Sequence, residues 1–224
     1  MITTVIFDLD GTLTDCNLEL AKARVSQALS ALSKKSYEDI LTHMNHIHYR
    51  CNVESIYDRN LWWDEFEVTL SPREKQELTH LYWESVMETT RIKPCAAYVL
   101  SELKKMGLLL VLLTDFDGKS FSKRKRIESL PILTYFDLVV IAGDDTEKPK
   151  PSPEPFTHIL DTLDIPPEQA LMIGDKPTVD LVGAASLGMY TLLLKGEYGS
   201  QWEHAVDDLI GILPFVRSLQ ENDL

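Results

Sequence analysis

The chain has 224 residues, of which 44% are hydrophobic and 25% are charged, a balance typical of folded globular proteins that excludes a disordered chain. Its 22 Lys and Arg residues against 35 Asp and Glu residues give a formal net charge of −13, which excludes nucleic acid as a first choice of partner because the surface repels a phosphate backbone. The longest apolar run, Leu108 to Leu113, is far shorter than the roughly 20 residues of a membrane helix. The three cysteines lie far apart, as is typical of reduced thiols, and the acidic N-terminal segment does not resemble a signal peptide. Together these features predict a cytoplasmic protein without membrane contact.

The first predicted element is a short buried strand, Thr3 to Phe7, which ends at Asp8 and is followed by a turn at Gly11. Residues 16 to about 90 contain no strand-like apolar run and show apolar residues at helical spacing. Within this block, the segment Ser71 to Glu74 carries the signature of a capping box, which predicts that a helix begins there. We therefore predict a block made entirely of helices.

From Pro94 onward, predicted helices and strands alternate. The predicted strands cover residues 108–113, 138–142, 170–173 and 190–194. The predicted helices cover residues 96–105, 120–130, 152–163 and 178–187. Strands separated by single helices are typical of a parallel sheet with helices on both faces. The sequence therefore predicts an α/β fold with a doubly wound parallel sheet, interrupted after its first strand by a helical insertion.

Polar and mostly acidic residues lie where these strands end. They are Asp8 and Asp10, Thr114 and Asp115, Asp144 and Asp145, and Asp175. The carboxyl ends of parallel strands line a common crevice, where ligands bind. Carboxylates gathered there would repel one another unless a hard cation neutralises them, and Mg²⁺ prefers oxygen ligands. The pattern predicts a Mg²⁺ site suited to phosphoryl transfer, in which Asp144 and Asp145 are better explained as turn residues than as ligands.

Four segments resemble, in order, the four motifs of the haloacid dehalogenase-like hydrolase superfamily. They are residues 5–15 (VIFDLDGTLTD), 110–114 (LVLLT), 150–156 (KPSPEPF) and 174–180 (GDKPTVD). Four motifs in the right order are far more specific than any one of them. The chain is most similar to the phosphatase branch that carries a helical cap between the first two motifs, as in phosphoglycolate phosphatase. The resemblance implies a Rossmann-like sheet of five parallel strands with the Asp8 strand in the centre.

The resemblance also implies the two catalytic residues. Asp8 would be the nucleophile that takes up the phosphoryl group as an aspartyl-phosphate. Asp10 would protonate the leaving oxygen and then deprotonate the water that hydrolyses this intermediate. Dehalogenase-like members lack an acid at the second position, and cation-pumping ATPases carry threonine there. An aspartate therefore implies a leaving oxygen that needs a proton, as in a phosphatase or a phosphomutase.

Three further residues would bind the phosphate. Thr114 would hydrogen-bond a phosphate oxygen with help from the backbone amide of Asp115, and Lys150 would pair with both the phosphate and Asp8. Lys148 competes with Lys150 for this role, and the spacing to the end of the third motif favours Lys150.

The resemblance further implies how Mg²⁺ would be held. Its ligands would be the carboxylates of Asp8 and Asp175 and the backbone carbonyl of Asp10, while Asp180 would orient these ligands.

The implied domains are a core made of residues 1–15 and 91–224 and a helical cap of residues 16–90. The implied function is Mg²⁺-dependent hydrolysis of a small phosphorylated metabolite. A phosphomutase would use the same motifs, and a non-enzymatic phospho-acceptor or binding domain is a third reading, disfavoured by the long helical insertion.

The cap selects the substrate, and neither the substrate nor the oligomeric state is encoded in the motifs. The basic run Lys123 to Arg126 is interpreted as a solvated helix face.

Overall fold

The protein is described by a computed structural model that covers residues 1–221. Its internal contacts separate two compact units. The first unit comprises residues 1–15, 92–115 and 127 onward, and the second comprises residues 16–91 and 116–126. Within the described residues, no helix has both the length and the apolar composition needed to cross a membrane.

The first unit is built on a six-stranded parallel sheet. Its strands are β1 (Thr4–Phe7), β4 (Leu109–Asp115), β5 (Leu138–Ala142), β6 (Ala170–Gly174), β7 (Tyr190–Leu194) and β8 (Ala205–Val206). The strand order is β5-β4-β1-β6-β7-β8, so β1 is paired on both sides, with Ile6 in register with Val111 of β4 and Met172 of β6. The predicted parallel sheet with a central Asp8 strand is confirmed. The sixth strand, β8, has two residues and therefore no periodicity that a sequence pattern could reveal.

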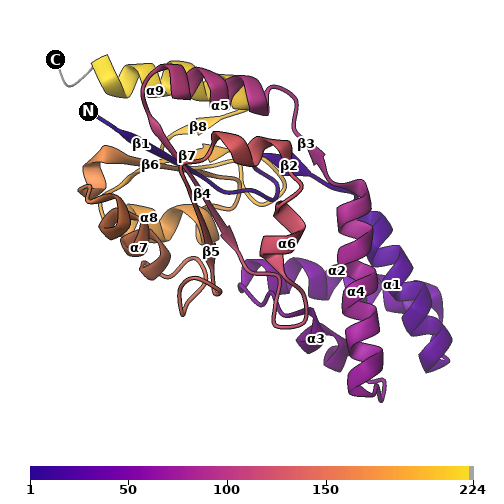
Figure 1. The fold of residues 1–224 in the computed structure, drawn as a ribbon. Coiled ribbons are helices and arrows are strands. Elements are labelled where there is room, and N and C mark those ends of the chain that lie inside the picture. The colour runs from indigo at the N-terminus through magenta and orange to yellow at the C-terminus, as the bar shows by residue number, and fades with distance from the viewer. Residues whose placement is uncertain (222–224) are drawn as a thin grey trace. The chain divides into compact units, whose positions relative to one another are not determined.

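Helices cover both faces of this sheet. Figure 1 shows α5 (Ala96–Lys105) and α9 (Ile212–Glu221) on one side and α7 (Glu154–Leu163) and α8 (Val182–Ser186) on the other. The central strands are buried on both faces, which explains their continuous apolar runs. The helix predicted over 178–187 begins with a π-helical turn, Pro177–Leu181, a rare conformation that is often found at functional sites.

Short connections complete the first unit. Three 3₁₀ turns cover Pro131–Tyr135, Pro167–Gln169 and Leu209–Gly211. The helix predicted over 120–130 is only α6 (Lys123–Ile127), and Pro131 opens the first of these 3₁₀ turns. Where the chain passes between the two units, β2 (Thr14–Asp15) and β3 (Arg91–Ile92) form a separate two-stranded sheet.

The second unit is helical, as the sequence predicts for residues 16–90. Its elements are α1 (Leu18–Ser33), α2 (Tyr37–Val53), α3 (Arg59–Trp62), a 3₁₀ turn (Trp63–Phe66) and α4 (Pro72–Thr89). The capping box at Ser71 and Glu74 is present at the start of α4. Apolar faces of these helices enclose a core rich in aromatic residues, including Trp62, Trp63 and Tyr82.

Residues 116–126, which the sequence placed with the core, instead pack within the helical unit. The ring of Phe121 stacks on Trp83 with a centroid distance of 5.7 Å, and the amide of Asn60 donates to Ser120 Oγ at 2.5 Å. These contacts attach the segment to α3 and α4. The segment therefore extends the helical unit beyond the insertion itself.

The interpretation of Lys123 to Arg126 as a solvated face is wrong for two of its four residues. Lys123 and Arg126 are buried, whereas Arg124 and Lys125 are exposed. The helical period places positions 123 and 126 on one side of α6. There they meet Asp117, whose Oδ2 accepts from Arg126 Nε at 2.7 Å and whose Oδ1 lies 3.4 Å from Lys123 Nζ.

Candidate active site

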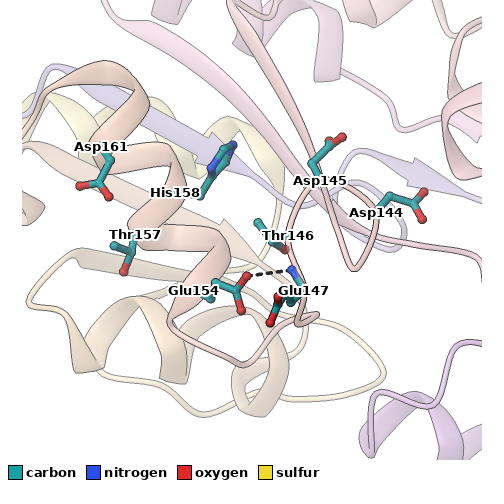
Figure 2. Close-up of a pocket in the computed structure, with 8 residues that line it drawn as sticks. All are labelled: Asp144, Asp145, Thr146, Glu147, Glu154, Thr157, His158 and Asp161. Atoms are coloured by element: carbon teal, nitrogen blue, oxygen red, sulfur yellow. Dashed lines mark hydrogen bonds between the residues drawn. The ribbon is translucent and has the colours of Figure 1, made fainter.

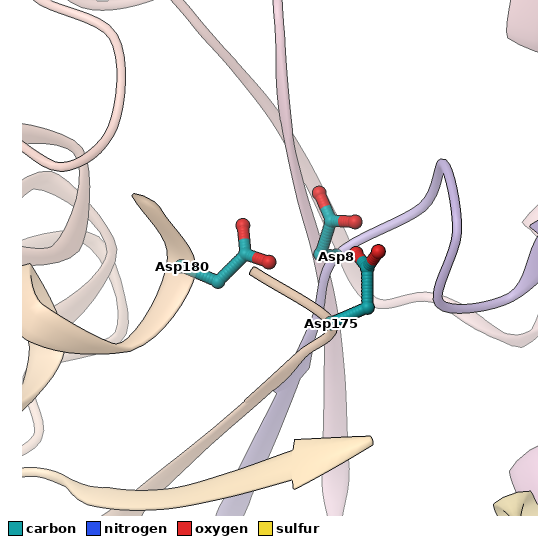
Figure 3. A group of neighbouring side chains, drawn as sticks. All are labelled: Asp8, Asp175 and Asp180. Atoms are coloured by element: carbon teal, nitrogen blue, oxygen red, sulfur yellow. The ribbon is translucent and has the colours of Figure 1, made fainter. Parts of the chain in front are cut away.

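Three buried carboxylates meet at the carboxyl ends of the two central strands of the first unit. Asp8 follows β1, Asp175 follows β6, and Asp180 lies on the π-helical turn. One oxygen of each lies within 4.8 Å of the others (Figure 3). Because β1 and β6 are hydrogen-bonded neighbours and the Asp8 amide donates to the Ile173 carbonyl at 2.9 Å, the sheet itself fixes the distance between Asp8 and Asp175.

Lys150 supplies positive charge to this cluster. Its side chain is fully buried, and its Nζ lies 2.7 Å from Asp8 Oδ1 and 2.7 Å from Asp180 Oδ1. Lys148, the competing candidate, is exposed. The ammonium group of Lys150 therefore contacts two of the three clustered carboxylates.

Burial in this cluster changes the acidity of two of the carboxyl groups. Burial raises the pKa of Asp175 to about 7, and the nearby charges of Asp180 and Asp8 add to this effect against the opposing charges of Lys176 and Lys150. Burial also raises the pKa of Asp8, although the charge of Lys150 opposes the rise. A divalent cation would stabilise the charged form of these buried carboxyl groups, and a donor set made of carboxylate oxygens fits a hard cation such as Mg²⁺.

Thr114 and Asp115, the last two residues of β4, are buried at the same edge of the sheet. The Asp115 carboxylate accepts from the Lys150 backbone amide at 2.8 Å, and its other oxygen lies 3.7 Å from Lys150 Nζ. Asp115 therefore anchors the loop that carries Lys150, a contact that the sequence did not predict.

Asp10 lies in the turn after β1, half-buried, with a backbone bridge to Thr14. Its side chain is not among the three carboxylates whose oxygens come together. Asp180, for which the sequence predicts only that it orients the metal ligands, is one of the three. Its oxygens accept hydrogen bonds from Lys150 Nζ and, at 2.9 Å, from the Lys176 amide. The Asp10 carbonyl as a metal ligand stays a prediction.

Sequence reasoning missed two residues of this cluster. Thr12 Oγ1 lies 3.2 Å from Asp8 Oδ2 and 3.3 Å from Asp175 Oδ1, so its hydroxyl can donate to either carboxylate. Gly11 has a φ of +91°, and a Cβ at this position would lie 2.5 Å from Asp175 Oδ2. The Asp-Gly turn signalled the unusual backbone at Gly11, but its close approach to a residue 164 positions away was not readable from the sequence.

A second hollow in the first unit is separate from this cluster. Figure 2 shows its lining residues, Asp144, Asp145, Thr146, Glu147, Glu154, Thr157, His158 and Asp161. Asp145 Oδ2 accepts from the Ile141 amide at 2.8 Å, which holds the turn after β5. Neither Asp144 nor Asp145 belongs to the group formed by Asp8, Asp175 and Asp180.

Comparisons with known proteins found a matching family model and several similar proteins. Residues 2–188 match the haloacid dehalogenase-like hydrolase family. Pyrophosphatase PpaX of Bacillus cereus is 32% identical over 199 residues, which cover 85% of this chain and 82% of the relative. Phosphoglycolate phosphatase of Shigella dysenteriae serotype 1 is 32% identical over 227 residues, which cover 92% of this chain and 85% of the relative. The crystal structure of a HAD phosphatase from Thermococcus onnurineus has the same fold, with a TM-score of 0.73 and 24% identity over 96% of this chain and 98% of that one.

Proposed function

The chain belongs to the haloacid dehalogenase-like hydrolase family, and from this membership we propose that it is a Mg²⁺-dependent phosphomonoester hydrolase acting on a small phosphorylated metabolite. The observation that supports this most strongly is the contact of Lys150 Nζ with both Asp8 and Asp180, beside Asp175. This contact holds Asp8 in one orientation at the centre of the carboxylate cluster. Pyrophosphate and phosphoglycolate, for which two of the relatives are named, are the first substrates to test.

In the proposed reaction, a carboxylate oxygen of Asp8 forms a bond to the phosphorus of the ester while the bond from phosphorus to the leaving oxygen breaks. Asp10 gives its proton to that oxygen, which leaves as an alcohol. Asp10 then takes a proton from water, the water oxygen bonds to phosphorus, and the Asp8 carboxylate is released with inorganic phosphate. Thr114, the Asp115 amide and Lys150 orient the phosphate during both steps.

The carboxylates of Asp8 and Asp175, with the Asp10 carbonyl, would hold Mg²⁺. When bound, the ion would neutralise part of the charge on the carboxylates and the phosphate, which otherwise repel each other. Asp180 would orient these ligands indirectly, because its own oxygens accept hydrogen bonds from Lys150 and from the Lys176 amide.

A panel of phosphomonoesters and pyrophosphate, assayed for release of inorganic phosphate with Mg²⁺ and with EDTA, tests this proposal. We expect release with Mg²⁺ and none with EDTA. Transfer of the phosphoryl group to a second hydroxyl instead of water would favour the phosphomutase. Absence of phosphate release and of transfer across the panel would contradict the proposed function.

The Asp10→Asn variant is expected to hydrolyse alkyl phosphates ~10²-fold or more slowly than the wild-type chain, because an amide cannot transfer the proton. With p-nitrophenyl phosphate, whose leaving group needs no proton, we expect a burst of nitrophenolate followed by slow turnover. The burst arises because Asp10 is still needed to activate water in the second step. Asp15→Asn, at an exposed position five residues further on, is the control. Wild-type rates in Asp10→Asn would remove Asp10 from the mechanism.

The Gly11→Ala variant is expected to lose ~10²-fold or more in kcat/KM, because the new Cβ forces the Asp175 carboxylate out of its position. Gly107→Ala is the matched control, since Gly107 also has a positive φ, of +80°, but no atom lies within 4 Å of the added Cβ. Both variants should lose about 1–2 kcal/mol of unfolding free energy from the backbone conformation, measured by thermal denaturation. Equal activity in the two variants would show that the position of Asp175 is unimportant for turnover.

A further inference from the structure

The turn that follows β1 (residues 9–14, here the β1 turn) lies directly against the buried carboxylates. A Cβ at Gly11 would come within 2.5 Å of Asp175 Oδ2, so this part of the backbone packs tightly on that side chain. The Thr12 hydroxyl lies 3.2 Å from Asp8 Oδ2 and 3.3 Å from Asp175 Oδ1. The peptide unit that joins Gly11 to Thr12 therefore sits beside two of the three clustered carboxylates, and a rotation of this unit would move both contacts.

The glycine gives this peptide unit conformational freedom. Gly11 has a φ of +91°, which glycine adopts without the steric cost that a side chain would add, and glycine restricts its backbone dihedrals less than any other residue. The peptide unit before Gly11 is fixed by the turn itself, because the Gly11 amide donates to the Thr14 carbonyl at 2.9 Å. The orientation of the unit after it depends on what binds the Gly11 carbonyl.

Lys93 binds that carbonyl. Its Nζ donates to the Gly11 oxygen, and its backbone amide donates to the Leu13 carbonyl at 2.9 Å, so the lysine contacts the β1 turn at two points. The side chain of Lys93 is 21% exposed, and its Nζ also lies 3.4 Å from Asp15 Oδ1, on a side chain that is 64% exposed. An ion pair that open to solvent contributes little, whereas a charged donor forms a strong hydrogen bond with a carbonyl. The contact with Gly11 is therefore the one that orders the turn.

This contact is a feature of the first unit alone. Lys93 and the β1 turn both belong to it, and the contact joins residues that are 82 positions apart in the chain. None of the four segments that resemble the family motifs contains Lys93. The lysine therefore supports the first motif from outside the motifs.

We propose that Lys93 is a positioning residue for the hydrolase reaction. Its ammonium group fixes the peptide unit between Gly11 and Thr12 and thereby holds Asp175 in the geometry that turnover needs. The inference rests on the proposed function. In this role Lys93 acts through the backbone and contacts neither the substrate nor the reacting atoms, so its loss should lower kcat and leave KM nearly unchanged.

The Lys93→Met variant, which keeps most of the aliphatic stem and loses the ammonium, tests this role. With p-nitrophenyl phosphate and saturating Mg²⁺, we expect kcat to fall ~10-fold and KM to stay within about twofold of the wild-type value. Lys93→Arg retains a charged donor, so its kcat should stay within about threefold of wild type. Asp15→Asn removes the other partner of the ammonium, and Lys105→Met removes an exposed lysine of the same unit. Both controls should keep wild-type kinetics.

Three kinetic outcomes would overturn the proposal. A kcat in Lys93→Met equal to that of Lys105→Met would show that turnover does not depend on the contact. A loss that falls on KM instead of kcat would place Lys93 in substrate binding. A kcat in Lys93→Arg as low as in Lys93→Met would show that a charged donor at this position is not what turnover requires.

A double variant tests whether Lys93 acts through Gly11. Gly11→Ala already displaces the β1 turn from Asp175, so the ammonium has little left to position. We expect kcat/KM of Gly11→Ala/Lys93→Met to lie within about threefold of that of Gly11→Ala alone. Independent effects would multiply, and a further loss of ~10-fold in the double variant would contradict the proposed route.

Hydrogen exchange separates this inference from the hydrolase proposal, because it needs no turnover. In Lys93→Met we expect the amides of residues 9–14 to exchange ~10-fold or more faster than in the wild-type chain, with β6 unchanged as a check that the core is folded. If the wild-type chain hydrolyses no ester, the hydrolase proposal fails and the exchange measurement still decides whether Lys93 holds the turn. Equal exchange of residues 9–14 in the two chains overturns the inference.

Discussion

The Lys150→Met variant is expected to unfold at a temperature roughly 10 °C below that of the wild-type chain. Lys150 is completely buried and its ammonium lies 2.7 Å from both Asp8 and Asp180. Removal of one partner from a buried ion pair costs about 3–5 kcal/mol, because the remaining charge has neither water nor a counterion. For a chain of this length, each kcal/mol corresponds to roughly 2–4 °C in melting temperature.

Thermal denaturation followed by circular dichroism would measure this loss, with EDTA present so that no bound metal stabilises the carboxylates. Lys148→Met is the matched control, since Lys148 lies two residues away and is exposed, and its unfolding free energy should change by less than about 0.5 kcal/mol. The Asp8→Asn/Lys150→Met double variant should recover part of the loss, because one buried carboxylate is then absent. Equal melting temperatures for Lys150→Met and Lys148→Met would show that Lys150 does not compensate the acidic cluster.

The Asp8→Asn variant is expected to lose turnover by roughly 10⁴-fold or more while it remains folded. An amide oxygen carries no negative charge and cannot form the acyl-phosphate bond, so the proposed covalent route is closed. The fold should survive because Lys150 keeps its contact with Asp180 and burial already disfavours the charged form of Asp8 by raising its pKa. Phosphate release with Mg²⁺ measures the loss, and the circular dichroism spectrum checks the fold.

Asp145→Asn is the control for this variant, because Asp145 is also an acidic residue just after a strand of the sheet but lies outside the carboxylate cluster. It should keep wild-type turnover. Comparable activity in Asp8→Asn and Asp145→Asn would mean that Asp8 is not the nucleophile.

Much of the core could be predicted from local patterns. The strands of the parallel sheet are buried on both faces, so their sequences are apolar runs that stop where the chain reaches the crevice, as β1 does before Asp8 and β6 before Asp175. The convergence of these residues follows from the geometry of a parallel sheet. The prediction that Asp8 and Asp175 lie together therefore depended on the strand ends, whereas Asp180, on the π-helical turn, was predicted only from the resemblance of the fourth motif.

The contacts that the sequence did not reveal depend on segments far apart in the chain. Thr12 touches Asp175 across the gap between two loops, and Asp115 holds the backbone of Lys150. Lys123 and Arg126 look like surface residues in a basic run, yet both are buried. Their partner Asp117 is near in the chain, but Trp83, which packs against Arg126, belongs to a distant helix. No local periodicity encodes such pairings, because they arise only when separate elements pack together.

If Asp8 is the nucleophile, the phosphoryl group should be found on its carboxylate during turnover. The wild-type chain, mixed with Mg²⁺ and a ³²P-labelled ester that it hydrolyses, is quenched in acid within one turnover and digested for peptide mapping. We expect label in the peptide that contains Asp8, bound through an acyl-phosphate that hydroxylamine cleaves, and no label in Asp8→Asn. Rapid release of phosphate with no label on the wild-type protein at any quench time would contradict the covalent mechanism.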